Sequence, residues 1–274
     1  MNDSDSIVCK PTPWFLFRAL VMLAMFSIFA FLFYKDGSSG YRKANEVYYL
    51  FKTFDQATKD FAEQNKSETL TPEDWKKYAA TQIVAFPKDT SLLPADLKLP
   101  MPWPEILQDH ERVKPLNMNK LWQDYSKVRK LPAKAPEHPY DAGKIFEQWV
   151  VFWVCATLAA GAAFFLIRTI GRSISVNSTG ITNQQGKMIP YADLKTLDLR
   201  KWETKGLAFL NYDGTSGKGK IRIDGLTYGG FKSENGQPAE ELMKHLRANF
   251  SGEIIEYAEI PASSAPAAPD AENA

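Results

Sequence analysis

The sequence predicts a membrane protein of the α+β class, with two transmembrane helices, an inserted mainly α-helical domain and a C-terminal sheet domain. Two apolar runs of membrane length predict the helices. The hydrophobic period then changes from helical to two-residue spacing after the second run, which predicts the sheet domain. The 33 basic and 32 acidic side chains nearly cancel, so we expect no nucleic-acid partner.

The first apolar run covers residues 14–34 and follows an N-terminal tail, residues 1–13. As a helix it rises about 30 Å, the thickness of the bilayer core. Arg18 is its only charge, and it lies one turn inside the run, from where its side chain can snorkel to the headgroups. A cleaved secretory signal is the alternative. Because the run is long and no clear Ala-x-Ala site follows it, we predict an uncleaved anchor.

The second apolar run covers residues 149–168 and contains no charge before Arg168. A buried core helix is the alternative, but such helices rarely extend this far without a polar face. Ala156, Ala160 and Gly161 belong to a surface of small residues, which allows close helix packing in lipid. Two interpretations stay open. The surface contacts another helix, either the first span, which we favour, or a second copy of the chain in a homo-oligomer through the second span. Alternatively, alanine and glycine are simply common in membrane helices.

The charges beside the spans predict the orientation. The segment between the spans is too long for its charges to count in the positive-inside rule. The informative basic residues are therefore the ones that precede the first span and follow the second: Lys10, Arg18, Arg168 and Arg172. They predict that the N-terminus and the C-terminus are both cytoplasmic.

Residues 35–148 predict an extracytoplasmic α-helical domain. After "KDGSSG", which we interpret as a flexible break, apolar residues recur along one helical face. Thr71 and Pro72 are typical of an N-cap and first helical position, and a third apolar stripe follows near residues 117–131. The proline-rich stretch between these helices predicts extended chain. The aromatic stripes favour core packing, and a ligand pocket lined by tryptophans is the alternative: Trp75, Trp103 and Trp122.

Residues 172–260 predict a domain of short strands followed by one helix, able to fold alone without metal or disulfide. Ile174 and Val176 alternate with polar residues, as in a half-buried strand. "GTSGKGK" lacks the spacing of a phosphate-binding loop and predicts a hairpin turn. The helical stripe near the end includes Leu246, and His245 lies on its polar side, where we expect it to be solvated. Residues 261–274 are typical of a disordered tail.

The order of these elements, with "GKMIPYADLKTLDL" after the first hairpin and one closing helix, resembles the pleckstrin-homology-like (PH-like) domains of bacterial membrane proteins. The resemblance covers residues 172–260 and is a pattern of elements. It implies a bent antiparallel β-barrel with a C-terminal helix at the cytoplasmic membrane face. It further implies a bacterial inner membrane location and a platform that binds lipid or protein without catalysis.

We identify no catalytic, metal-binding or cofactor-binding residues in the sequence. His110 and His138 lie far apart and lack metal-ligand spacing. The candidate lipid- or partner-binding residues are Lys218, Lys220 and Arg222, which lie around one predicted hairpin turn. Basic residues near an anionic leaflet attract its headgroups. The alternative is a solvated turn, because lysines at hairpin tips also discourage edge-to-edge aggregation.

The sequence therefore predicts a non-enzymatic two-span scaffold or adaptor whose partners are membrane lipids and other membrane or cytoplasmic proteins. One alternative is a transmembrane sensor whose outer helical domain binds a ligand. Another is an accessory subunit of a membrane transport complex. A ligand pocket in the outer domain would favour the sensor, and co-purification with a large membrane partner would favour the subunit.

Overall fold

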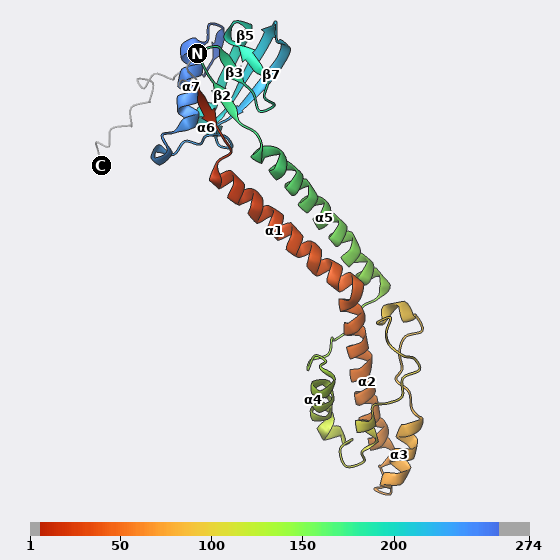
Figure 1. The fold of residues 1–274 in the computed structure, drawn as a ribbon. Helices are drawn as coiled ribbons and strands as arrows, with labels where there is room; N and C mark the ends of the chain where they lie inside the picture. Colours follow the sequence, from red (N-terminus) through yellow and green to blue (C-terminus); the bar gives the residue numbers. More distant parts are fainter. Residues whose placement is uncertain (1–5, 258–274) are drawn as a thin grey trace, which may run out of the picture. The chain divides into compact units, whose positions relative to one another are not determined.

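The computed structural model describes residues 6–257, so the tail expected at residues 261–274 lies outside the described part. The chain is α+β, with two sheets and two long apolar helices (Figure 1). It divides into two compact units. The sheet unit comprises the chain up to Ala24 and from Ala160 onwards, and the helical unit comprises Met25–Ala159.

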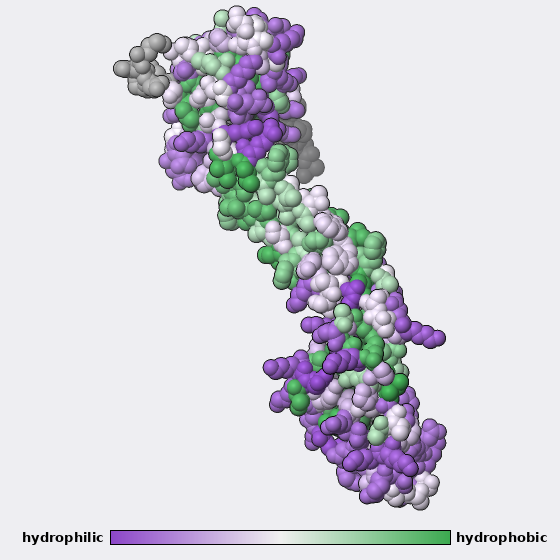
Figure 2. Space-filling view, turned by 45° about the vertical axis from the view of Figure 1, so that its right-hand side comes forward, coloured by the Kyte–Doolittle hydropathy of each residue, from purple (hydrophilic) through white to green (hydrophobic). Residues whose placement is uncertain are grey.

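Two helices are long and apolar enough to cross a membrane: α1, Pro13–Lys35, and α5, Ala142–Ile170. Many of their apolar side chains are exposed and form the green surface in Figure 2. Large exposed apolar areas are unfavourable in water, whereas a helix surrounded by lipid requires them. Within the helical unit, Tyr34 packs against Trp149 and Phe152, with ring centroids 5.7 and 5.6 Å away.

The helix α1 does not end at the flexible break expected from the sequence. A π-helical segment, Asp36–Gly40, joins it to α2, Tyr41–Gln64, and the two form one continuous helix of 52 residues. Arg42 donates hydrogen bonds from Nη1 to the carbonyl oxygens of Gly37 and Ser38. These bonds satisfy carbonyl groups that the wider π-helical turn presents, so the glycine–serine run remains helical.

The helical unit surrounds one apolar core. Its helices are α2, α3 at Pro72–Thr81 and α4 at Met118–Arg129, and short 3-10 turns occur at Thr90–Leu92, Glu105–Gln108 and Pro115–Asn117. Thr71 is the N-cap of α3, as predicted, and its hydroxyl accepts a hydrogen bond of 3.2 Å from the Asp74 N–H. The aromatic stripes on these helices supply much of the core, which includes Phe54, Phe61, Trp75, Trp103 and Trp122.

The sheet unit contains two four-stranded sheets. The first, in the order β1-β2-β3-β4, is antiparallel and consists of Ile7–Cys9, Ile174–Val176, Gly180–Thr182 and Met188–Pro190. The second, in the order β7-β6-β5-β8, consists of Gly217–Asp224, Leu207–Gly214, Leu194–Lys201 and Glu253–Ile255, with β8 parallel to β5. As predicted, "GTSGKGK" belongs to the β6–β7 hairpin rather than to a phosphate-binding loop.

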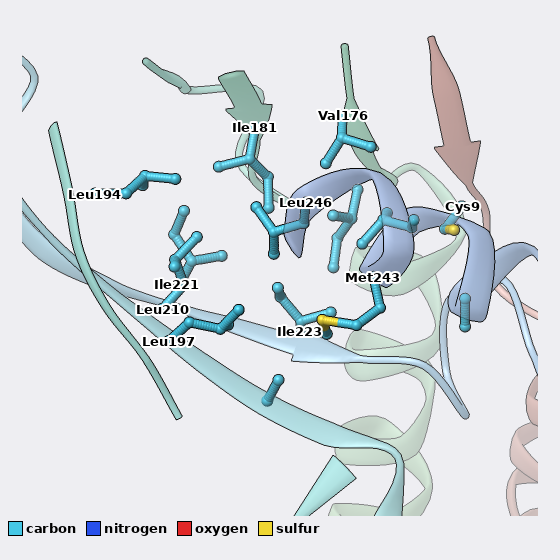
Figure 3. Packing of buried hydrophobic residues seen from close by; sticks show 14 of the residues in the cluster. Cys9, Val176, Ile181, Leu194, Leu197, Leu210, Ile221, Ile223, Met243 and Leu246 are labelled. Carbon is cyan, nitrogen blue, oxygen red and sulfur yellow. The ribbon is translucent and has the colours of Figure 1, made fainter. Parts of the chain in front are cut away.

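Neither sheet closes into a barrel, so the barrel implied by the resemblance is not formed. The strands of the first sheet have only three residues each, and the 3-10 turn Tyr191–Asp193 leads the chain from β4 into the second sheet. The helix α7, Pro238–Asn249, packs on the apolar core of this unit; the helix α6, Trp202–Lys205, is a single turn after β5. Figure 3 shows Met243 and Leu246 of α7 among the sheet residues, with Cys9 of β1 beside the helix.

Candidate functional site

The chain segment before α1 is bound to a loop of the sheet unit that we call the junction loop, residues 225–232. The backbone N–H of Thr12 donates to the Thr227 carbonyl at 2.8 Å, and the N–H of Gly229 donates to the Lys10 carbonyl at 2.9 Å. The Thr12 hydroxyl also donates to the Leu226 carbonyl at 3.0 Å. These bonds fix the start of α1 to the junction loop.

Thr12 also caps the helix α1. Its hydroxyl oxygen accepts a hydrogen bond of 3.2 Å from the Phe15 N–H, while Pro13 occupies the first helical position. A threonine cap followed by proline is a standard start of a helix, and the Thr12-Pro13 pair before the apolar run is a signal that the sequence analysis did not use. One threonine therefore links the start of the helix to the junction loop.

A cavity of about 340 Å³ lies where these two segments meet. We call it the junction cavity. Its volume falls within the usual range of small-molecule sites. Its wall is mainly apolar, and its polar side chains are those of a threonine, a lysine and an asparagine; the lining residues are Thr12, Pro13, Trp14, Leu226, Gly229, Gly230, Phe231, Lys232 and Asn235.

Two consecutive glycines shape the cavity wall. Gly229 and Gly230 have φ angles of +89° and +79°, a backbone conformation that other residues rarely adopt. A Cβ at Gly229 would lie 2.8 Å from the Cys9 sulfur, so a larger residue would push β1 away from the loop. The "LTYGGF" stretch that reads as a turn in the sequence is thus also a contact surface for the N-terminal strand.

Basic residues at the end of α5 lie near the same loop. Burial raises the pKa of Tyr228, and the neighbouring positive charges of Arg172 and Arg168 oppose this rise. Lys232 forms an ion pair of 3.0 Å with Glu234, and both side chains are exposed. The charge of Asp224 adds to the rise, so the junction loop has charges of both signs beside a cavity that is largely apolar.

The predicted basic residues lie together on one outward face of β7. Lys218 forms an ion pair with Asp213 at 3.2 Å, and Arg222 forms one with Asp224 at 2.8 Å. Lys220 has no such partner in the described chain; its Nζ lies 4.2 Å from the centre of the Phe209 ring, a cation–π contact. Two of the three charges are thus compensated locally.

The predicted small-residue surface lies along α5. Ala156 is partly buried in the helical unit. Ala160 is exposed in the sheet unit, and no atom lies within 4 Å of the position that a Cβ of Gly161 would occupy. The position of a Cβ at Gly161 is therefore open in the described chain.

The helical unit has a separate groove of about 660 Å³ between the proline-rich segment 101–106 and α4. Trp103 lines it, but Trp75 and Trp122 do not. Their indole N–H groups are held in the core, where Trp75 donates to the Leu107 carbonyl at 2.9 Å and Trp122 donates to the Ala133 carbonyl at 2.8 Å. The three tryptophans thus do not line one common pocket.

The histidines in the described part of the chain do not form a catalytic or metal-binding centre. His110 contacts Glu111 and the Leu70 carbonyl, each at 3.1 Å. His245 differs from the expectation of a solvated side chain, because its Nε2 is buried and has no hydrogen-bond partner in the described chain. Within residues 6–257, no group of three or more histidine, cysteine, aspartate or glutamate side chains is arranged to hold a metal ion.

In comparisons with known proteins, no family model, no curated protein and no solved structure matches this chain.

Proposed function

We propose that this chain is a non-enzymatic scaffold or adaptor held in a bacterial cytoplasmic membrane by two spans, α1 and α5. Its sheet domain, residues 172–257 together with β1, is a PH-like platform at the cytoplasmic face that binds protein partners or lipid headgroups. The segment 35–148 is an extracytoplasmic domain. Both ends of the chain are cytoplasmic.

The pairing of β1 with β2 is the main support for the two-span topology in this proposal. The strand β1 precedes the first apolar helix and β2 follows the second, and the two pair in antiparallel register. Strands that pair must lie on the same side of a membrane, which two spans allow and a single span forbids. The flanking basic residues then favour the cytoplasmic side.

The outer face of β7 supports a protein partner more than a lipid surface. Two of its basic residues, Lys218 and Arg222, already form ion pairs with aspartates. A mixed-charge face of this kind suits polar recognition of another protein, where complementary charges set specificity. An anionic leaflet instead attracts clusters of unpaired basic residues.

Labelling of two exposed positions tests the topology. In a chain with Cys9→Ala and Cys155→Ala, cysteines are introduced separately at Ala95 and Ser251, which are both exposed. A membrane-impermeant maleimide should label Ala95→Cys in intact spheroplasts, and Ser251→Cys only after permeabilisation. Equal labelling of both sites before permeabilisation would overturn the two-span proposal.

Crosslinking followed by purification in mild detergent tests the scaffold role. Proteins recovered with the wild-type chain should be lost when the sheet domain is unfolded by Leu246→Asp, since Leu246 is fully buried in its core. Recovery of the same proteins with that variant would contradict a role for the sheet domain. A large transport complex among the partners would favour the accessory-subunit alternative.

The groove of the helical unit favours the sensor alternative. Its volume suits a small ligand, and Val128 on its wall is 81 % exposed although it is apolar. The continuous helix through Asp36–Gly40 would connect such a site mechanically to the first span. A compound that raises the melting temperature of the wild type but not of Val128→Asp would favour this function over the scaffold.

A further inference from the structure

We propose that the junction cavity binds one anionic phospholipid of the surrounding leaflet. The glycerol and upper acyl carbons occupy the apolar part of the cavity, and the phosphate lies beside Lys232. This inference rests on the proposed function, because it requires that α1 enter a membrane. It assigns the lipid contact to the start of α1 rather than to the hairpin tip of β7.

The position of the cavity supports a lipid as its occupant. Trp14 lines the cavity, belongs to the first turn of the apolar helix α1 and is 62 % exposed. It stacks on Phe17, one turn further along, with ring centroids 5.9 Å apart. Tryptophan favours the interface between headgroups and acyl chains. The cavity therefore opens at headgroup depth, and its wall continues into the apolar surface of the helix.

The two-part chemistry of the wall matches a phospholipid. Leu226 is 59 % exposed although it is apolar, and Phe231 is partly buried and packs against Trp202 with a centroid distance of 5.3 Å. Lys232 and Asn235 supply a cation and an amide on the polar side. A soluble metabolite would leave the apolar wall in contact with water, whereas an acyl chain covers it.

The charge of the loop favours an anionic lipid over a zwitterionic one. Among the residues that line the cavity in the described chain, Lys232 carries the charge, and its ion pair with Glu234 is exposed and therefore weak. Arg168 lies in the last turn of α5 and Arg172 lies two residues beyond its end, so both lie near headgroup depth in the proposed membrane. The positive charge of Lys232 at the cavity attracts phosphate groups.

A bound lipid would contact both segments that form the junction. Residues 12–14 belong to the start of α1, and residues 226–235 belong to the sheet domain. Because the ligand touches both, its binding free energy adds to the hydrogen bonds that already hold Thr12 to the loop. The lipid would thus strengthen the attachment of the domain to the first span.

Lipid retention by the full chain tests the proposal. The protein is reconstituted in nanodiscs of equal parts phosphatidylglycerol and phosphatidylcholine, released into mild detergent and examined by native mass spectrometry. The wild type should retain one phosphatidylglycerol. Lys232→Glu should weaken this retention about fivefold to tenfold, because a single basic group near an anionic leaflet contributes about that factor and reversal removes more. Lys232→Arg should retain the lipid.

Two further variants separate the site from its surroundings. Leu226→Asp should also reduce retention, because it places a carboxylate on the apolar wall. Lys66→Glu is the matched control, since Lys66 is likewise an exposed lysine in an ion pair with a glutamate, but lies in the helical unit. It should retain lipid as the wild type does. The melting temperature of each variant verifies that it is folded.

The outcomes distinguish a failure of the proposed lipid site from a failure of the proposed two-span topology. Unchanged retention in folded Lys232→Glu and Leu226→Asp, or an equal loss in Lys66→Glu, would overturn the lipid site. A wild-type chain that enters nanodiscs but retains no lipid would do the same and leave the scaffold proposal intact. Failure of the chain to enter nanodiscs at all would overturn the two-span function on which the inference rests.

Discussion

Ile7 lies opposite Val176 in an antiparallel strand pair, although two apolar helices separate these residues along the chain. Cys9 lies opposite Ile174 in the same pair and is buried in the core of the sheet domain. The domain is therefore assembled from both ends of the described chain. Its first sheet is complete only when β1 pairs with β2.

A peptide should restore stability to the isolated C-terminal segment. Residues 172–257 without β1 leave the edge of β2 unpaired and remove the buried Cys9 side chain from the core. We expect this segment to melt several degrees below a version fused to residues 6–12, because a change of about 1 kcal/mol shifts the melting temperature of a domain this size by about 4–8 °C. A synthetic peptide of residues 6–12 should raise its melting temperature by strand addition.

The control for this peptide carries Ile7→Asp, which places a charge on the inward side of the strand. It should have no effect on the melting temperature, because burial of an unpaired carboxylate is unfavourable. Equal stabilisation by both peptides, or by neither, would show that β1 is dispensable for the domain.

Cys9 should resist thiol reagents as long as β1 is docked. Its side chain is 1 % exposed, and burial, together with the charge of Glu241, raises the pKa of the thiol to about 11. At pH 7.5 the thiol is therefore protonated as well as shielded, and the thiolate is the reactive form. Labelling by a maleimide should be slow in the folded protein and fast after unfolding.

The matched control is Val8→Cys combined with Cys9→Ala. Val8 belongs to the same strand but is 47 % exposed, so a cysteine there should react rapidly. Ile7→Asp should make Cys9 reactive by releasing the strand. Rapid labelling of Cys9 in the folded wild type would mean that β1 is not held in the core.

The helices were more predictable from the sequence than the junction. A helix start such as Thr71 depends on local residues, and the structure confirms this N-cap. The break expected at Asp36–Gly40 was wrong because Arg42, one turn later, satisfies the carbonyl groups of that segment. Local composition indicated a flexible stretch, whereas the bonds that keep it helical come from a side chain outside it.

The strand β1 and the junction cavity were missed for a different reason. Three apolar residues in an N-terminal tail are too few to show a period. Their partner, β2, follows the second apolar helix, so no local pattern relates Cys9 to Ile174. The cavity likewise needs both Thr12 and the junction loop, which lie more than 200 residues apart in the sequence.

Acid should destabilise the sheet domain between about pH 4 and pH 2. The Ser216 N–H donates to the Asp193 carboxylate at 2.7 Å, and this bond lowers the pKa of Asp193. Hydrogen bonds from Arg200 lower the pKa of Asp198 to about 2. Each lowered pKa contributes stability that is complete above the unfolded value of about 3.9 and is lost as the pH falls through the folded value.

Asp193→Asn should lower the melting temperature at pH 7 and reduce its dependence on pH below 4. Ser216 and Thr215 both donate to the same oxygen, Oδ2, so an amide oxygen there can still accept both bonds, but it carries no charge to titrate. Asp213→Asn is the control, because Asp213 is exposed near the same hairpin and pairs with the exposed Lys218. If the melting temperature of Asp193→Asn falls with pH as steeply as that of the wild type, the charge of Asp193 does not contribute to the acid sensitivity of the domain.

The last prediction concerns α7, which packs on the core of the sheet domain. Leu246 is fully buried there, whereas Lys244, two residues earlier on the same helix, is exposed. Leu246→Asp should destabilise the domain by about 3–5 kcal/mol, because it removes apolar packing and buries an unpaired carboxylate. Lys244→Asp introduces the same residue on the solvent side and should change the free energy of unfolding by about 0.5 kcal/mol or less. Urea unfolding of residues 172–257 fused to residues 6–12 would measure both, and a similar loss of stability in the two variants would show that α7 does not pack through the face that contains Leu246.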